Sequence, residues 1–407
     1  MQQYTESTTI GARLRILRKW RKMTLAQVAG LAGMSVSHLS NIERGLSALD
    51  RRSYIAGLAG ALRVSESDLV GGPHLSADPL QSEPHSHVSA LRQALTSAEL
   101  GESAVERARP VAELAELLAG PVEHAWRSND YVTEGQLLPD LIDELHYHVA
   151  APADEAALQL ALNTLVEASV HASGLARILG YADLGHVGAA KAVDAANRLG
   201  DPVARGRAMY MFARSDGRDW TRAARKAEAE VARLQPDATS SEALQVLGML
   251  MLNAAMAQAA NLRLDAARAW LDEAAEVARH VPDDIDRNWE SFGSTNVKIW
   301  RIKVGVEMGE GGRQVLDLAK TIDRSRLGTY PARKANFLTE VGRGLAREKK
   351  TRDGAVTWLL NAERVGPQRF RNLSRVRETV AVLMEQAKAD AGGRELRGMA
   401  ARLGIPY

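Results

Sequence analysis

The chain has 407 residues, of which 45% are hydrophobic and 25% charged, a composition typical of a globular protein with two or more domains. It contains no cysteine, which excludes disulfides, thiolate metal sites and cysteine nucleophiles. No uninterrupted apolar run reaches the roughly 18 residues that span a bilayer, and residues 1–9 lack the apolar core of a secretory signal, so we expect a cytoplasmic protein without membrane contact.

The net charge of +2 is unevenly distributed along the chain. Residues 1–72 contain ten basic and five acidic side chains, whereas the remaining part of the chain carries a net charge of −3. A basic segment attached to a slightly acidic body indicates an anionic partner for the basic segment.

Residues 8–72 are predicted to form a small domain of five helices. The signals are apolar stripes at helical spacing, side chains that cap first turns, and glycines that end helices. Thr24 and Gln27, for example, form a capping box at the start of the second helix. Asp50 is expected to cap the fourth helix. The expected helices cover residues 10–20, 24–32, 36–44, 51–62 and 65–70.

The second and third of these helices are joined by a tight turn at Gly33-Met34, which is the helix-turn-helix pattern. The run from Thr24 to Val70 closely resembles the Cro and lambda-repressor-like class, often called the xenobiotic-response-element family. The resemblance implies a five-helix DNA-binding domain whose third helix lies in the major groove. The matching positions include Ala29, Gly33, Ser35, Leu39, Ile42, Glu43, Gly45, Leu58, Ala59, Leu62, Val64 and Leu69.

The resemblance also implies which side chains meet DNA. Val36, Ser37 and Asn41 match the base-reading positions, where Val36 offers apolar contact and Asn41 can bond adenine bidentately, worth about 1–3 kcal/mol of discrimination. Arg18 and Glu43 match a structural ion pair of the family. Contacts to the DNA backbone are expected from Gln27, Ser35, His38, Ser40, Arg44, Ser47, Arg51 and Arg52.

One position departs from the family pattern. Many members place a polar residue, often Gln, first in the second helix, where it contacts the DNA backbone, whereas this chain has Leu25. We therefore expect that contact to be missing or to be made by Gln27.

Residues 73–89 are predicted to be a linker, because Pro, Ser and His are frequent there and no periodicity is visible. His74, His85 and His87 are interpreted as part of this polar segment, since no further ligand is spaced to complete a metal site. Residues 90–156 are expected to form a helical connecting region.

From residue 157 to 407 the sequence predicts helix after helix, and an internal repeat is visible. Its clearest unit, 250–279, consists of two helices around a turn at 261–263. A small residue recurs early in each second helix, at Ala189, Ala223, Ala266, Val315 and Ala355. The repeat resembles the tetratricopeptide repeat, which implies an all-α fold that ends in an α-solenoid with a concave groove.

That groove is expected to bind a ligand. Asn296 and Asn336 occupy equivalent places in adjacent repeats, and so do Tyr210 and Asn253. In the resembling peptide pheromone receptors, such asparagines bind the peptide backbone, because an amide both donates and accepts hydrogen bonds. The alternative interpretation is that they are ordinary asparagines on helix surfaces.

Together the two parts resemble peptide-sensing transcription regulators of Gram-positive bacteria, the RRNPP group. The resemblance implies a cytoplasmic homodimer, with repression as the expected sign, that binds a palindromic operator in double-stranded DNA. A small peptide or protein ligand in the body would control that binding. The alanine- and arginine-rich, lysine-poor composition indicates an actinobacterial source.

Two alternatives for the body stay open. It could be a scaffold that docks a folded partner protein, or it could carry an enzymatic activity. The sequence contains no HExxH motif, no Gly-rich phosphate loop and no GxSxG motif. We therefore expect no catalysis, no cofactor and no bound metal.

Overall fold

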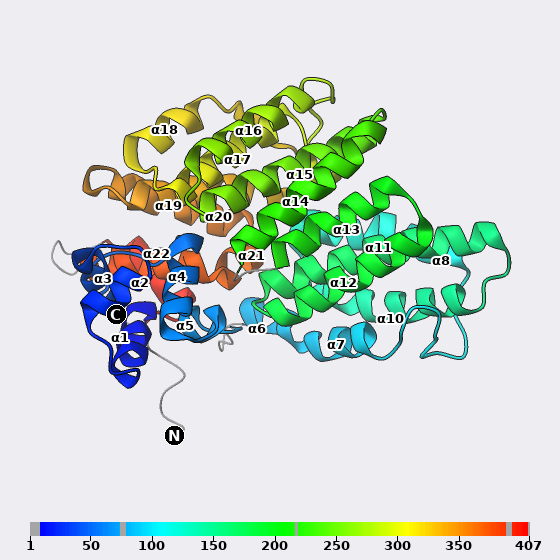
Figure 1. Cartoon of the computed structure of the whole chain (residues 1–407), viewed down its shortest axis with the longest axis horizontal. Coiled ribbons are helices and arrows are strands. Elements are labelled where there is room, and N and C mark those ends of the chain that lie inside the picture. Colours follow the sequence, from blue (N-terminus) through cyan, green and yellow to red (C-terminus); the bar gives the residue numbers. More distant parts are fainter. Residues whose placement is uncertain (1–8, 74–78, 216–218, 388–392, 406–407) are drawn as a thin grey trace.

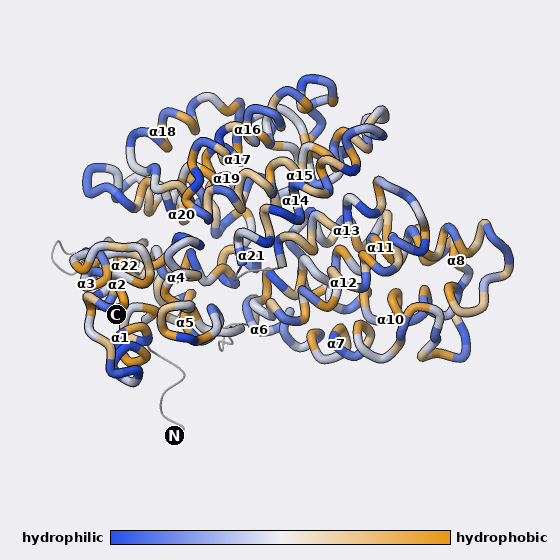
Figure 2. Tube along the Cα trace, in the orientation of Figure 1, coloured by the Kyte–Doolittle hydropathy of each residue, from blue (hydrophilic) through white to orange (hydrophobic). Residues whose placement is uncertain are grey.

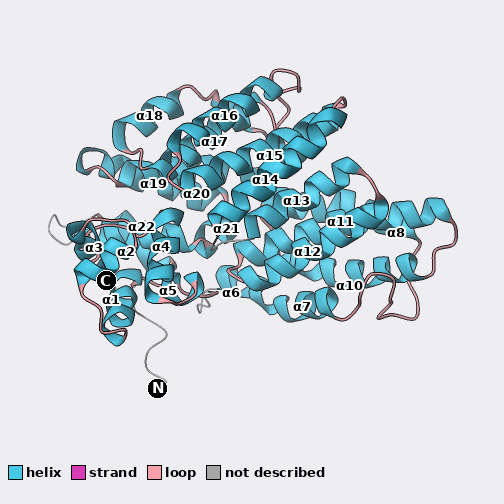
Figure 3. Cartoon of the chain, in the orientation of Figure 1, coloured by secondary structure: helices cyan, strands magenta, loops and turns pink. Residues whose placement is uncertain are grey.

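The computed structural model describes residues 9–73, 79–215, 219–387 and 393–405. Within these ranges the regular structure is helical and no strand occurs, which confirms the predicted fold class (Figure 3). An N-terminal head, α1 to α5, lies beside helix α22 of a much larger helical body, α6 to α23 (Figure 1).

The helices of the head are α1 Ile10–Trp20, α2 Leu25–Leu31, α3 Val36–Glu43, α4 Arg52–Leu62 and α5 Glu66–Val70. The helices of the body are α6 Pro79–Ser86, α7 Val88–Thr96, α8 Val111–Leu117, α9 Glu123–Ser128, α10 Tyr131–Ala150, α11 Glu155–Ile178, α12 Ala182–Leu199, α13 Pro202–Ser215, α14 Trp220–Leu234, α15 Ser241–Ala260, α16 Leu264–Ala278, α17 Ser294–Met308, α18 Gly312–Lys320, α19 Pro331–Ala346, α20 Arg352–Val365, α21 Pro367–Asn372, α22 Ser374–Ala387 and α23 Arg394–Arg402.

The head has a hydrophobic core of its own. Leu14 and Leu58 are fully buried in an apolar cluster to which all five of its helices contribute. The predicted capping box at Thr24 is present. The predicted scaffold pair is present too, because Arg18 donates two hydrogen bonds to the carboxylate of Glu43, at 2.6 and 2.7 Å.

The start of α4 differs from the prediction. Asp50 does not cap this helix, because the N-cap is Arg51, whose side chain makes no capping bond. Asp50 instead receives hydrogen bonds from two arginines of the body, Arg343 and Arg347. A buried carboxylate gains more from two guanidinium groups than from one amide, so the tertiary ion pairs override the local capping preference.

Residues 73–89, predicted to be a linker, differ from the prediction because they contain a helix. Helix α6 lies inside this segment, and Gln81 and His85 of this helix are buried against α21. A ring nitrogen of His85 lies 3.1 Å from the side-chain oxygen of Asn372. Local periodicity could not reveal this helix, since the residues of α21 that Gln81 and His85 bond lie almost 300 residues away. His74 lies outside the described residues.

Helices α11 to α20 pack in sequence as five helical hairpins. Each predicted repeat position falls on the second helix of a hairpin, on α12, α14, α16, α18 and α20. Ala189, Ala223, Val315 and Ala355 are buried, whereas on α16 the buried residue is Ala267 and not Ala266. The small residues therefore lie where the paired helices approach each other.

Two large apolar clusters hold the body together, one running from α7 to α17 and the other from α17 to α23. Hydrophobic segments accordingly appear along most helices of the body in Figure 2. By length and composition α15 could cross a membrane, but 94% of its apolar window is buried inside the protein. This helix is therefore the central core helix of the body.

The hairpins do not leave an open groove. The early helices of the body return to the late ones, because α9 packs against α19 and α6 against α21. The backbone amide of Tyr131 donates to the side chain of Gln368 at 2.8 Å, and Arg127 donates to the carbonyl oxygen of Asp286 at 2.6 Å. The concave side of the hairpins therefore surrounds an internal cavity, in place of the open groove that the repeat resemblance implies.

Candidate functional site

The third helix of the head begins with an exposed end. Ser35 caps α3 with its hydroxyl, Val36 is 46% exposed, and Ser37 is exposed as well. Asn41 lies one turn later and is half-buried, and its side-chain oxygen accepts a hydrogen bond from Arg44 at 2.6 Å. The amide nitrogen of Asn41 thus keeps its donor capacity, while its acceptor is already engaged.

The residues predicted to contact the DNA backbone fall into two groups. Gln27, Ser35 and Arg44 are exposed and Ser40 is half-buried, all of them around α2 and α3. The side chain of Gln27 also completes the capping box, since its oxygen accepts the amide hydrogen of Thr24 at 2.8 Å. This first group therefore stays accessible on the head.

The second group faces the body. Arg51 lies over the ring of Tyr54, 4.5 Å from its centroid, and donates to its hydroxyl. His38 packs against the same ring, and burial together with the nearby Arg51 lowers the pKa of His38. Ser47 is half-buried in the loop that leads to α4. Two of the groups expected to bind phosphate, Arg51 and His38, are therefore already engaged with Tyr54.

The first turn of α4 is bonded to the body through Glu307, which is only 2% exposed. One oxygen of its carboxylate accepts the backbone amides of Arg52 and Ser53, at 2.6 and 3.3 Å, and the other accepts the Arg52 guanidinium at 2.8 Å. Free amides at a helix N-terminus together with an arginine form a common binding site for phosphate. Glu307 occupies the place that an external anion would take.

A second ion cluster binds the loop before α4. Asp50 lies 2.9 Å from Arg343 and 3.1 Å from Arg347, and both Asp50 and Arg343 are buried. Burial alone would raise the pKa of Asp50, but the guanidinium groups of Arg347 and Arg343 outweigh burial and lower it. Asp50 therefore stays ionised and fixes the loop to α19.

Helix α22 adds a third contact through Glu378. This buried carboxylate accepts the backbone amide hydrogen of Leu49 at 3.1 Å. Burial raises the pKa of Glu378 to about 7, and the hydrogen bond from Leu49 only partly offsets that effect. Close by, the side chain of Gln386 donates to the carbonyl oxygen of Leu46. The head is thus held on the body by hydrogen bonds and ion pairs.

The four residues predicted to bind a peptide are only partly brought together. Tyr210, Asn253 and Asn336 line a cavity of about 190 Å³ inside the body, whereas Asn296 is not among its lining residues. Asn296 is fully buried and donates to the backbone carbonyl of Glu290 at 3.2 Å.

The two asparagines of the predicted peptide site that line the cavity already make hydrogen bonds within the protein. Asn253 donates to the backbone carbonyl of Tyr210 at 2.7 Å, and Asn336 accepts a hydrogen bond from Arg369 at 2.6 Å. Both amides therefore already stabilise the walls of the cavity.

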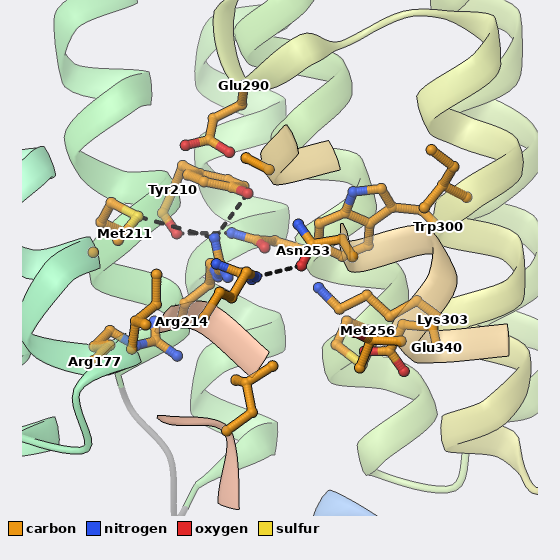
Figure 4. A pocket seen from close by; sticks show the side chains of 18 of the residues that line it. Arg177, Tyr210, Met211, Arg214, Asn253, Met256, Glu290, Trp300, Lys303 and Glu340 are labelled. Atoms are coloured by element: carbon orange, nitrogen blue, oxygen red, sulfur yellow. Dashed lines mark hydrogen bonds between the residues drawn. The ribbon is translucent and has the colours of Figure 1, made fainter. Parts of the chain in front are cut away.

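The most distinctive property of this cavity is its charge, which the sequence interpretation missed. The described residues that line it include seven cationic and two acidic side chains. Figure 4 shows Arg177, Arg214 and Lys303 pointing into the cavity from three different helices. The cationic residues are Arg52, Arg177, Arg214, Lys303, Arg333, Arg369 and Arg375, and the acidic ones are Glu290 and Glu340.

These cations come from seven helices, so no sequence window contains more than one or two of them. A weak local signal exists at Lys303, which follows the buried apolar residues Trp300 and Ile302 of α17. Charged residues at such positions are candidates for an internal polar site.

Comparison with known protein families gives one match. Residues 9–70 match the family model described as a helix-turn-helix domain, which covers the head and none of the body. Comparison of the chain with curated proteins and with solved structures finds no match. The head is therefore a helix-turn-helix DNA-binding domain of the xenobiotic-response-element type. This domain supports a role for the chain as a DNA-binding regulator, and the rest of the described chain is a helical body.

Proposed function

We propose that this protein is a transcription regulator that reads double-stranded DNA with α3. The exposed N-terminal end of α3, at Val36 and Ser37, is the observation that carries the proposal. In helix-turn-helix domains this end of the recognition helix meets base edges in the major groove. The donor of Asn41, one turn further, is suited to an acceptor on a base.

The docked head is the low-affinity state in this proposal. Phosphate binding beside the major groove would use the first turn of α4 and Arg52, which Glu307 engages instead. Without these backbone contacts the head keeps its base-reading residues but loses part of the electrostatic affinity for DNA. Release of the head from the body would restore them, so the body acts as the control element.

A ligand of the body supplies that control. The resemblance of the hairpins to tetratricopeptide repeats favours a signalling peptide as this ligand. The resemblance to the RRNPP group favours repression of transcription by the DNA-bound protein. The cavity asparagines that were expected to bind a peptide are engaged in the cavity wall. We therefore retain ligand control as the proposal and assign the ligand class from the cavity itself, below.

The alternative function, a scaffold for a folded partner, is less well supported. Such a scaffold would present a contiguous apolar patch. Of the large hydrophobic side chains that are exposed in the described structure, only Leu160 and Leu262 belong to the body. We likewise propose no catalytic role for the body.

A homodimer completes the proposal, since one head contacts few bases and paired heads suit a palindromic operator. Footprints should then show two half-sites about one helical turn apart, roughly 34 Å.

The test uses the full chain and DNA selected from a random pool. Ser37→Ala and Asn41→Ala should each weaken specific binding by about tenfold or more and relax the base preference at one position. Asn163→Ala, at an exposed position on α11, serves as the control and should bind like the wild type. Unchanged affinity and base preference in both head variants would refute DNA reading by α3.

A further inference from the structure

We propose that the central cavity binds a small organic anion, about the size of one ring with at least two negative charges, and that Arg52 of the head forms part of this site. The DNA consequence of this proposal rests on the proposed function, whereas the binding itself does not.

Two of the seven cations that line the cavity, Arg177 and Arg375, have guanidinium groups without a partner among the described residues. The two acidic side chains of the cavity are already used, because Glu290 pairs with Arg333 and Glu340 with Arg343. The guanidinium groups of Arg177 and Arg375 make no hydrogen bond or ion pair with any described residue, and one buried nitrogen of each lacks a partner altogether. Unpaired buried charges are costly, so proteins keep them where a ligand completes the pairing.

Electrostatics inside the cavity agree with this geometry. Burial, followed by repulsion from neighbouring arginines, lowers the pKa of Arg177 and of Arg375 to about 9. The ammonium of Lys303 lies 3.9 Å from the centroid of the Trp300 ring, and burial lowers its pKa well below the ordinary value. An anion placed among these three groups would relieve both the desolvation and the repulsion.

Size and lining restrict the class of ligand. The cavity volume of about 190 Å³ is slightly larger than the ~150 Å³ cavity that holds one benzene ring. Aromatic and sulfur side chains, among them Tyr210, Trp300 and Met256, form the walls between the cations (Figure 4). A flat organic group fits these walls while its charged substituents meet the arginines. An extended peptide does not fit this volume.

Arg52 connects the cavity to the head. It is the one described lining residue that the head contributes, and it also lies 5.9 Å from the ring of Trp220. Its charge repels both Arg177 and Arg375. An anion between these groups would replace repulsion by attraction and hold the first turn of α4 more firmly on the body. The ligand should therefore lower the affinity of the protein for DNA.

The binding experiment uses calorimetry on the full chain with pyrophosphate, citrate and phenyl phosphate, at an ionic strength held constant with sodium chloride. We expect saturable binding of one molecule per chain for at least one probe. Binding of the phosphate probes alone identifies a ligand with a phosphate group, and binding of citrate alone identifies a polycarboxylate. Absence of saturable binding for all three probes would overturn the proposal.

Variants locate the site. Arg177→Gln and Arg375→Gln should each weaken binding by about tenfold or more. In the absence of anion both should unfold at the same or a higher temperature than the wild type, because each removes an unpaired buried charge. Arg313→Gln, at an exposed position on α18, is the matched control. Wild-type affinity in both cavity variants, or a lowered unfolding temperature without anion, would show that these arginines serve the fold.

A gel-shift assay then tests the coupling. The bound anion should lower DNA affinity in the wild type and leave the Arg177→Gln variant unaffected, which separates cavity binding from general competition between polyanions and DNA. If the anion binds and wild-type DNA affinity does not change, the role of Arg52 is refuted. If the protein binds no DNA with or without the anion, the proposed function is refuted. Calorimetry still shows whether the cavity binds an anion.

Discussion

Glu307 and Arg52 are joined by two hydrogen bonds, one from the backbone amide of Arg52 and one from its guanidinium, although 255 residues separate them. Through this pair the body caps a helix of the head with one of its own carboxylates. The same two donors are the ones that a DNA phosphate would use. One side chain therefore stabilises the docked head and, in the proposed function, would compete with DNA.

Replacement of Glu307 by Gln should raise DNA affinity by about tenfold or more, because the amide keeps the size of the side chain but loses its charge. The variant should also show faster hydrogen exchange in the first turn of α4. Glu276→Gln on the outer surface of α16 is the control. Equal DNA affinity of Glu307→Gln and wild type would mean that the docked head is not restrained by this carboxylate.

Asp50→Asn should lower the free energy of unfolding by about 3–5 kcal/mol, since it leaves the buried guanidinium of Arg343 and that of Arg347 without their shared carboxylate. Urea denaturation of the full chain measures this change. Asp317→Asn, at a solvent-exposed position, should leave the urea midpoint unchanged. A similar midpoint for the two variants would contradict the structural role of Asp50.

The raised pKa of Glu378 predicts a pH dependence. Its value of about 7 lies above the ordinary 4.5, so between these values the folded protein keeps a proton that the unfolded chain has released. The contribution to stability is complete below about pH 4.5 and is lost as the pH rises through 7, at a cost of about 3 kcal/mol. Asp50, Arg377 and Arg13 also face this carboxylate.

Glu378→Gln should therefore be more stable than the wild type at pH 8 and similar to it at pH 5. Thermal unfolding of both proteins across this range provides the measurement. The difference between the two profiles isolates Glu378 from Glu134, whose pKa is also raised to about 7 by burial. Parallel profiles would show that Glu378 does not titrate in this window.

Substitution of two glycines of the head by alanine should change its stability in opposite directions. A Cβ at Gly11 would collide with the backbone carbonyl of Ile42 on α3, so Gly11→Ala should destabilise the head by roughly 1–3 kcal/mol. Gly60 lies in α4 with open space around it, and Gly60→Ala should stabilise the head by about 0.5–1 kcal/mol. Hydrogen exchange of α1 and α3 reports both changes. Effects of the same sign would argue against the close approach of α1 to α3.

The head could be predicted from sequence because its signals are local. The capping box at Thr24, the turn at Gly33 and the pair formed by Arg18 and Glu43 all involve residues within one short segment. The hairpins of the body were predicted for a related reason, since a small residue must stand where two helices meet, as Ala189 and Ala355 do.

What the sequence could not reveal depends on contacts between distant segments. The sequence around Asp50 does not indicate that this residue pairs with Arg343 and Arg347 and does not cap α4. The sequence around Glu307 likewise does not indicate a hydrogen-bond partner in the head. The charge of the cavity arises in the same way, because each of seven helices contributes only one cation. Contacts between residues that lie 200 or more positions apart leave no trace in local sequence patterns.

The apolar cluster of the head contains no residue of the body, and the clusters of the body contain none of the head. Separation of the two parts therefore exposes charged and polar groups to water and leaves both hydrophobic cores intact. An opened molecule would stay soluble and folded, because it would not expose the apolar surface through which partly unfolded proteins aggregate. Salt screens exposed charges far more than buried pairs, so it would favour the opened form, in which these charges face water.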